Sequence, residues 1–204
     1  MNRREFLVRA TIGGVTVPLL ITEIGCSEDD GGPGGPGPGS ETFVSTLAQG
    51  HTHTITISDG DLTAGGAHNY TSSSTGHTHQ VNLSAQQIDN LSVGCKVTQV
   101  SSNTDNHTHT WEILFADLVT DVQTTSQADT TGHSHTVTVV AEDLVGVPSA
   151  RSIPTSAPNV GAAHTHSVAL DVADYQALQN CNSVLKTTVA DSTGHSHTFQ
   201  IQRA

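Results

Sequence analysis

Basic and aromatic residues are scarce in this chain of 204 residues. It has 7 Lys and Arg against 19 Asp and Glu, and aromatic residues make up only 3% of the sequence. Proteins that bind nucleic acid need clustered basic side chains to displace counterions, so that class of function is disfavoured. Hydrophobic residues make up 34%, which is enough for one modest core and argues against a multidomain enzyme.

Sequence motifs of several enzyme classes are also missing. The chain has no Gly-x-Ser-x-Gly nucleophile elbow, no phosphate-binding loop and no dinucleotide-binding fingerprint. Cofactors recognised by those motifs are therefore not expected, and the reaction classes open to the chain are few.

The N-terminal residues resemble a bacterial export signal. Arg3 and Arg4 are followed by Phe6 and Leu7, as in the twin-arginine signal. The weakly apolar run of residues 10–21 is short for a membrane span. The resemblance implies that the protein is exported in folded form.

A second resemblance concerns Cys26. Ile24-Gly25-Cys26 resembles the end of a lipobox, in which the cysteine is acylated and becomes the mature N-terminus, although Glu23 stands where the pattern has an apolar residue. We therefore expect residues 1–25 to be a twin-arginine lipoprotein signal. The mature protein would be periplasmic or on the cell surface, anchored in a membrane by the lipid on Cys26. A simple N-terminal membrane anchor or an unrelated cleavage is the alternative.

The residues after this signal divide into a tether and a domain. Gly and Pro dominate residues 31–39, and at this density they can neither bury apolar surface nor hold a strand ladder. Residues 26–42 are thus predicted to be a solvated tether, and residues 43–204 a single β domain.

Histidine is the abundant residue of that domain. Of the 13 histidines, 12 form His-x-His pairs: His51/His53, His77/His79, His107/His109, His133/His135, His164/His166 and His195/His197. The first histidines of alternate pairs lie 56 and 57 residues apart, so a unit of two pairs repeated three times fits the spacing best. A division into two halves of three pairs also fits, and it places Cys95 and Cys181 at equivalent positions.

Each pair opens a segment in which apolar and polar residues alternate. Ile55 and Ile57 share the parity of the histidines before them, whereas the intervening residues are Thr. This pattern predicts strands whose His pairs begin on the buried face. Short helical turns are expected after the first five strands, at residues 59–62, 84–91, 116–119, 141–144 and 171–178.

The fold class that follows is all-β. Returning strands joined by polar loops predict an antiparallel sandwich or closed barrel, built from internal repeats, with about nine to twelve strands and single helical turns between them.

Two local features are also predicted. Ser84 and Gln87 have the spacing of a capping box. Pro148, Pro154 and Pro158 predict an irregular loop between the fourth and fifth pairs.

The His pairs predict metal sites. A buried polar group without a partner costs roughly 1 to 3 kcal/mol, and two imidazoles on one face of a strand can converge on one ion. All-imidazole sites favour Cu(II), Zn or Ni over Mg or Ca, with Cu(II) or Zn expected above all. Two pairs per ion would make at most three four-His sites. A hydrogen-bonded lattice of His and Thr is the alternative. His68 lies outside the pairs and is predicted to be an ordinary loop histidine.

Known enzymes with His-x-His motifs extend the motif in ways that this chain does not. Metallo-β-lactamase-like enzymes continue into Asp-His, whereas His53 is followed by Thr54 and Ile55, and no copy has the same-face Glu of cupin-like proteins. The leading hypothesis is therefore a metal-binding protein for buffering or sequestration. A metalloenzyme with an open His-ligated site, or a structural or adhesive envelope protein with a His-rich core, is the alternative.

Cys95 and Cys181 are the only cysteines of the predicted mature domain besides the lipidated one. In an oxidising compartment they can form a disulfide, and two buried free thiols are the alternative.

Overall fold

The computed structural model describes residues 39–73, 76–128, 132–146, 149–161, 163–190 and 194–203. The predicted signal, Cys26 and most of the predicted tether lie outside the described residues. Strand β1 begins at Ser40, three residues before the predicted start of the domain.

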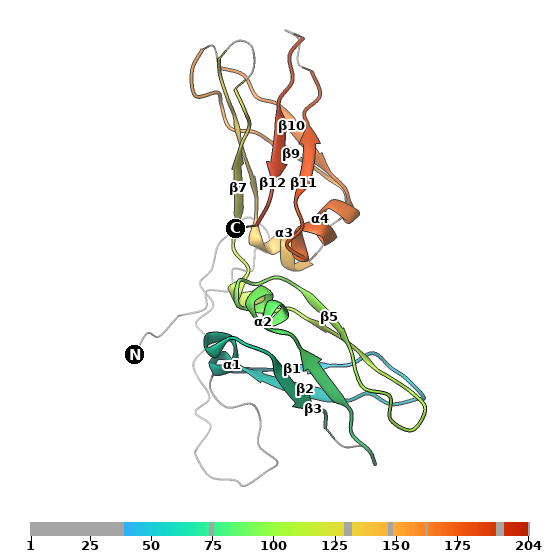
Figure 1. Ribbon diagram of the computed structural model, residues 1–204. Helices are drawn as coiled ribbons and strands as arrows, with labels where there is room; N and C mark the ends of the chain where they lie inside the picture. The colour runs from blue at the N-terminus through green and yellow to red at the C-terminus, as the bar shows by residue number, and fades with distance from the viewer. Residues whose placement is uncertain are drawn as a thin grey trace, which may run out of the picture. The chain divides into compact units, whose positions relative to one another are not determined.

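Twelve strands dominate the described residues and pair as six antiparallel hairpins (Figure 1). The hairpins are β1 (Ser40–Val44) with β2 (Thr54–Ser58), β3 (His68–Thr71) with β4 (Gln80–Leu83), β5 (Val97–Val100) with β6 (Thr110–Ile113), β7 (Val122–Thr125) with β8 (Thr136–Val139), β9 (Arg151–Pro154) with β10 (Ser167–Leu170), and β11 (Val184–Thr187) with β12 (Thr198–Ile201). The prediction of an antiparallel all-β fold is confirmed. Strand β9 lies where an irregular loop was predicted, because Pro154 occupies the last position of its strand, where the sheet tolerates proline.

The predicted sandwich or closed barrel is not confirmed. Each described sheet has two strands, and neighbouring hairpins are joined near the His pairs by isolated backbone hydrogen bonds rather than by continuous ladders. In the first three hairpins these bonds run from Thr46 N to Thr110 O, from Ser73 N to Thr54 O and from Ser102 N to Gln80 O, each at 2.8 Å.

Short helices follow the second strand of each of the first five hairpins, as predicted. They are α1 (Asp59–Ala64), α2 (Ala85–Ser92), the 3-10 turn η1 (Ala116–Leu118), α3 (Ala141–Gly146) and α4 (Val172–Gln179). Ser84 forms the predicted capping box with Gln87 at the start of α2. All helices of the described part are too short or too polar to cross a membrane.

The hairpins form two halves, each with its own hydrophobic core. Three hairpins of residues 39–118 surround one core, and three of residues 119–203 surround the other. In each half the last strand returns to the first, β6 to β1 and β12 to β7. The prediction of three two-pair units is therefore wrong, and the alternative of two halves describes the fold, because a core closes only when three hairpins enclose it.

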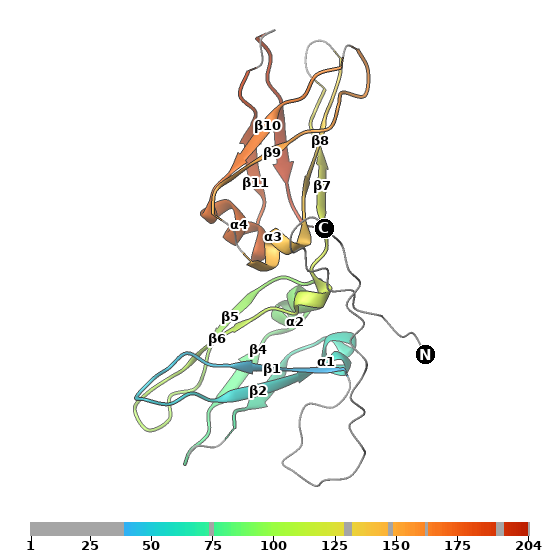
Figure 2. The same ribbon diagram turned by 180° about the vertical axis from the view of Figure 1, so that it is seen from behind.

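Side chains alternate between core and solvent as predicted. Ile55 and Ile57 are buried, whereas Thr56 between them is exposed. Trp111 is fully buried, and its indole Nε1 donates to Phe43 O, which ties β6 to β1. In each half the helices lie at one end of the hairpins and the loops that carry the His pairs lie at the other (Figures 1 and 2).

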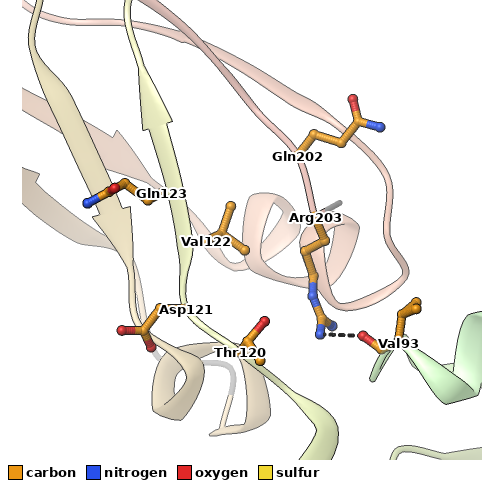
Figure 3. Close-up of a pocket in the computed structure, with 7 residues that line it drawn as sticks. All are labelled: Val93, Thr120, Asp121, Val122, Gln123, Gln202 and Arg203. Atoms are coloured by element: carbon orange, nitrogen blue, oxygen red, sulfur yellow. Dashed lines mark hydrogen bonds between the residues drawn. The ribbon is translucent and has the colours of Figure 1, made fainter.

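The two halves are also linked covalently. Cys95, just after α2, forms a disulfide with Cys181, just after α4. Lys96 N donates to Gln179 O beside it, and the guanidinium of Arg203 donates to Gly94 O. The guanidinium also donates to Val93 O (Figure 3). The pocket around Arg203 is lined by residues that include none of the histidines.

Candidate metal centre

The six His pairs gather in two clusters, one in each half. The first His site contains His51, His53, His77, His79, His107 and His109, and the second His site contains His133, His135, His164, His166, His195 and His197. Each hairpin contributes one pair, from the residues just before its second strand. The predicted set of three four-His sites is therefore wrong, because three hairpins converge on each centre rather than two.

Each site has two layers of imidazoles. The second histidines of the pairs form an inner triad beside the core, and those of the first site, His53, His79 and His109, are at most 1% exposed. The first histidines form an outer triad nearer the loops, and two of them in the first site, His51 and His77, are half-buried. The inner triad rests on the apolar core, where the ring of His109 lies 6.1 Å from that of Trp111.

The imidazole Nε2 atoms converge on the middle of each site. In the second His site, one ligand atom from each of the six histidines lies within 4.8 Å of all the others. In the first site five histidines meet this limit, and His79 joins them with its Nε2 3.2 Å from that of His77. Five pairs of neighbouring Nε2 atoms in each site are 3.1 to 3.3 Å apart.

The rings are arranged regularly around this point. In the first His site each imidazole is in T-shaped contact with all the others except one, at centroid distances of 4.8 to 5.1 Å. Among these six described residues, the pairs not in contact are His51 with His79, His53 with His107, and His77 with His109. The second site repeats this pattern at 4.7 to 5.3 Å.

Backbone carbonyls fix which ring nitrogen carries the proton. Nδ1 of His79 lies 2.9 Å from Ser102 O, and Nδ1 of His109 lies 2.9 Å from Thr46 O. In the second site Nδ1 of His135 lies 2.8 Å from Ser156 O. A carbonyl only accepts, so Nδ1 must donate, and in a neutral ring the Nε2 lone pair then points to the centre of the site. In each case the carbonyl belongs to a neighbouring hairpin, so the same bond also joins two hairpins of the half.

A buried hydroxyl supports each inner histidine, and sequence reasoning missed all six. In the first half Ser45, Ser72 and Ser101 accept from the backbone N–H of His53, His79 and His109, at 2.9 to 3.1 Å. In the second half Ser126, Thr155 and Thr188 play the same part for His135, His166 and His197, at 2.9 to 3.1 Å. A Ser or Thr does precede every pair in the sequence, but at separations of 5 to 9 residues that conceal the repeat.

The surroundings of the sites favour neutral imidazole. Burial lowers the pKa of His53, His109 and His197 below the usual 6.5, and the neighbouring imidazoles lower it further. Neutral imidazole is the form that binds a metal. At the rim of the first site, the Asp105 carboxylate lies 3.6 Å from Nδ1 of His77.

His68 takes no part in either site. It begins strand β3 rather than lying in a loop, and its ring stacks on Tyr70. Its Nε2 lies 3.2 Å from Gly65 O, and its Nδ1 lies 3.6 Å from Asp61 Oδ1.

The two clusters can therefore hold transition-metal ions through nitrogen donors alone. Comparison of the chain with models of protein families, with curated proteins and with solved structures gave no match. The functional argument consequently rests on the geometry of the sites.

Proposed function

We propose that this protein is an exported, membrane-tethered metal-binding protein that holds one transition-metal ion in each of its two His sites. The observation that carries the proposal is the direction of the inner imidazoles. Nδ1 of His79, His109 and His135 donates to a backbone carbonyl, so the Nε2 lone pairs of these rings point toward the other imidazoles of their site, as His79 Nε2 does toward His77 and His135 Nε2 toward His164. Lone pairs gathered in this way repel unless a cation lies among them.

A hydrogen-bonded His lattice explains the same positions less well. Each bond between two Nε2 atoms needs a proton on one of them. Neutral inner rings such as His79 and His109 have placed theirs on Nδ1, and Nδ1 of the outer His51 and His107 also faces a carbonyl, at 3.4 and 3.3 Å. Additional protons would charge closely spaced rings, which their burial opposes. His109 Nε2 is buried without a hydrogen-bond partner among the described residues, as expected for a ligand atom.

Each ion would also stabilise the fold. The three hairpins of a half share no continuous sheet, so an ion bound by all three joins them at the end away from the helices. Because the unfolded chain does not hold the pairs in register, the free energy of binding adds to the free energy of unfolding.

Export, anchoring and a role in metal buffering or sequestration belong to the same proposal. Arg3, Arg4 and the Cys26 motif support export and lipidation. Imidazole nitrogen is a donor for several transition-metal ions, Cu(II) and Zn among them, and the geometry of the shell decides between these ions. Replacement of Cys26 with Ala should release the protein from membranes into the soluble fraction, as measured by fractionation and immunoblotting. Unchanged membrane retention would contradict the lipid anchor.

Metal titration tests the binding function. Calorimetry should show that the chelator-stripped mature chain binds two equivalents of metal ion. The bound ions should raise its melting temperature. The double change His77→Ala with His79→Ala should leave one equivalent, as should His164→Ala with His166→Ala in the other half. His68→Ala, outside both sites, should still bind two. Absence of saturable binding tighter than about 10 μM would show the His clusters to be structural.

A further inference from the structure

The arrangement of the six rings defines a coordination geometry. In an octahedron each corner has one opposite corner and shares an edge with all the rest. The imidazoles of the first His site have this relation, with opposite pairs His51–His79, His53–His107 and His77–His109. The outer triad is one triangular face of this octahedron, and the inner triad is the opposite face.

The distances agree with a metal at the centre. The Nε2 atoms of the outer triad are 3.1 to 3.3 Å from one another, and His77 Nε2 is as close to those of His53 and His79. These are the edges of an octahedron whose centre lies about 2.2 to 2.3 Å from its corners, close to a metal–imidazole bond of roughly 2.1 Å. The second site has the same edges, so both sites can contract slightly onto one ion.

The three axes of the octahedron are equivalent. Each axis joins the outer histidine of one hairpin to the inner histidine of another. The three hairpins contribute in the same way, so the three axes have the same composition. Cu(II) favours tetragonal sites, which need one axis unlike the others, and structural Zn sites have four ligands. Neither preference matches six equivalent nitrogens.

We propose, on the basis of the metal-binding function above, that each His site binds its ion through all six imidazoles in an octahedral shell. The sites then select ions that accept six nitrogen ligands, namely Fe(II), Co(II) or Ni(II), over Zn(II) and Cu(II). The complete shell leaves no position for water or substrate, so the bound ion is not a hydrolytic centre of the open type.

Cobalt alone, added to the stripped mature chain, provides the first test. Octahedral Co(II) is faintly coloured, whereas tetrahedral Co(II) absorbs strongly in the visible region. We expect the chain to bind two equivalents of Co(II) with weak visible absorption, and X-ray absorption to give six nitrogen neighbours for each cobalt. In a separate competition, Ni(II) should displace Zn(II) at equal concentration. Bound cobalt with strong absorption or four nitrogen neighbours would overturn the six-coordinate shell while leaving metal binding intact. Failure to bind any ion would overturn the proposed function itself.

Single substitutions provide the second test. Removal of one ligand by His107→Ala or His79→Ala should open one position, change the Co(II) spectrum of the first site and allow added imidazole to restore it. His195→Ala should do the same in the second site, and His68→Ala should change nothing. In each variant the unaltered site reports whether the chain is folded. If the spectrum were unchanged in all three ligand variants, those histidines would not be ligands and the octahedral shell would be wrong.

Discussion

Backbone carbonyls determine which ring nitrogen of His79, His109 and His135 faces the centre of the site. Where Nδ1 donates to a carbonyl, as His79 does to Ser102 and His109 to Thr46, the ring orientation and the free Nε2 are fixed before any ion binds. Loss of a group that holds a metal ligand in place in this way typically weakens metal binding 10- to 100-fold. The ligands are therefore only part of what the sequence must encode for a site.

The buried hydroxyl of Ser101 tests this point. Its Oγ accepts from His109 N, lies 3.2 Å from His79 Nδ1 and donates to Ser102 O. Ser101→Ala should lower the free energy of unfolding by about 1 to 3 kcal/mol, because a buried N–H loses its partner. It should also weaken metal binding in the first site by roughly 10- to 100-fold, as measured by calorimetry. The control Ser92→Ala removes an exposed hydroxyl and should change neither quantity.

The lowered pKa values predict how the metal-free chain responds to acid. His53, His109 and His197 have lower pKa values in the folded chain than the 6.5 of the unfolded chain, with burial as the main cause. As the pH falls below about 6.5, the unfolded state takes up these protons first, so stability should be highest above that pH and decrease below it. Urea unfolding between pH 7.5 and 5 measures the decrease. It should be smaller in His109→Gln, and a flat profile would contradict the burial of these rings.

At the scale of the hairpin, alternation was sufficient to place the strands. Ile55 and Ile57 are buried, as the parity predicts, and each His pair directly precedes its strand with the second histidine buried beside the core. The capping box of α2 could also be found from Ser84 and Gln87. These features depend on residues close in the sequence, and local pattern is informative at that range.

Features that depend on distant residues could not be predicted. The spacing of the pairs favours three units over two halves, and the structure differs because the halves are formed by long-range contacts such as that of Trp111 with Phe43, 68 residues away. The supporting hydroxyls were missed because the loops differ in length. The number of sites depends on which hairpins come together, and this is also decided by long-range contacts. The sequence therefore predicted three sites, whereas the described residues form two.

Strand parity yields a direct mutational test. Ile57→Lys places a charge without a partner in the core and should destabilise the first half by more than about 3 kcal/mol. Thr56→Lys changes the exposed face and should remain within about 0.5 kcal/mol of the wild type. Thermal unfolding of the two variants measures the contrast. Equal tolerance at both positions would refute the register of β2 with β1.

At the scale of the whole molecule, the described residues form two closely similar halves in succession. Each half has three hairpins, its own core and its own His site. The Cys95–Cys181 disulfide joins equivalent points of the two halves, after the helix that follows the middle hairpin. The sites therefore do not depend on the disulfide for their ligands.

Removal of this bond should separate stability from metal binding. The disulfide closes a sequence separation of 86 residues, which corresponds to at most about 4 to 5 kcal/mol. The double variant Cys95→Ser with Cys181→Ser should melt at a lower temperature yet still bind two ions. In calorimetric scans of this cysteine variant we expect one unfolding transition for each half. Adding His77→Ala and His79→Ala should lower the temperature of only one of the two transitions. Loss of both ions in the cysteine variant would show that the halves are not independent.

The layering of each site also governs how fast its ion can leave. An ion held by both triads lies between the apolar core below the inner rings and the outer rings above, so its exit requires the tips of the hairpins to separate. Such local opening occurs at a rate set by the protein. Removal of the ion by a chelator should therefore follow a first-order time course whose rate stops rising as the chelator concentration increases. The protein would then retain the ion it first acquired long after the composition of its surroundings had changed.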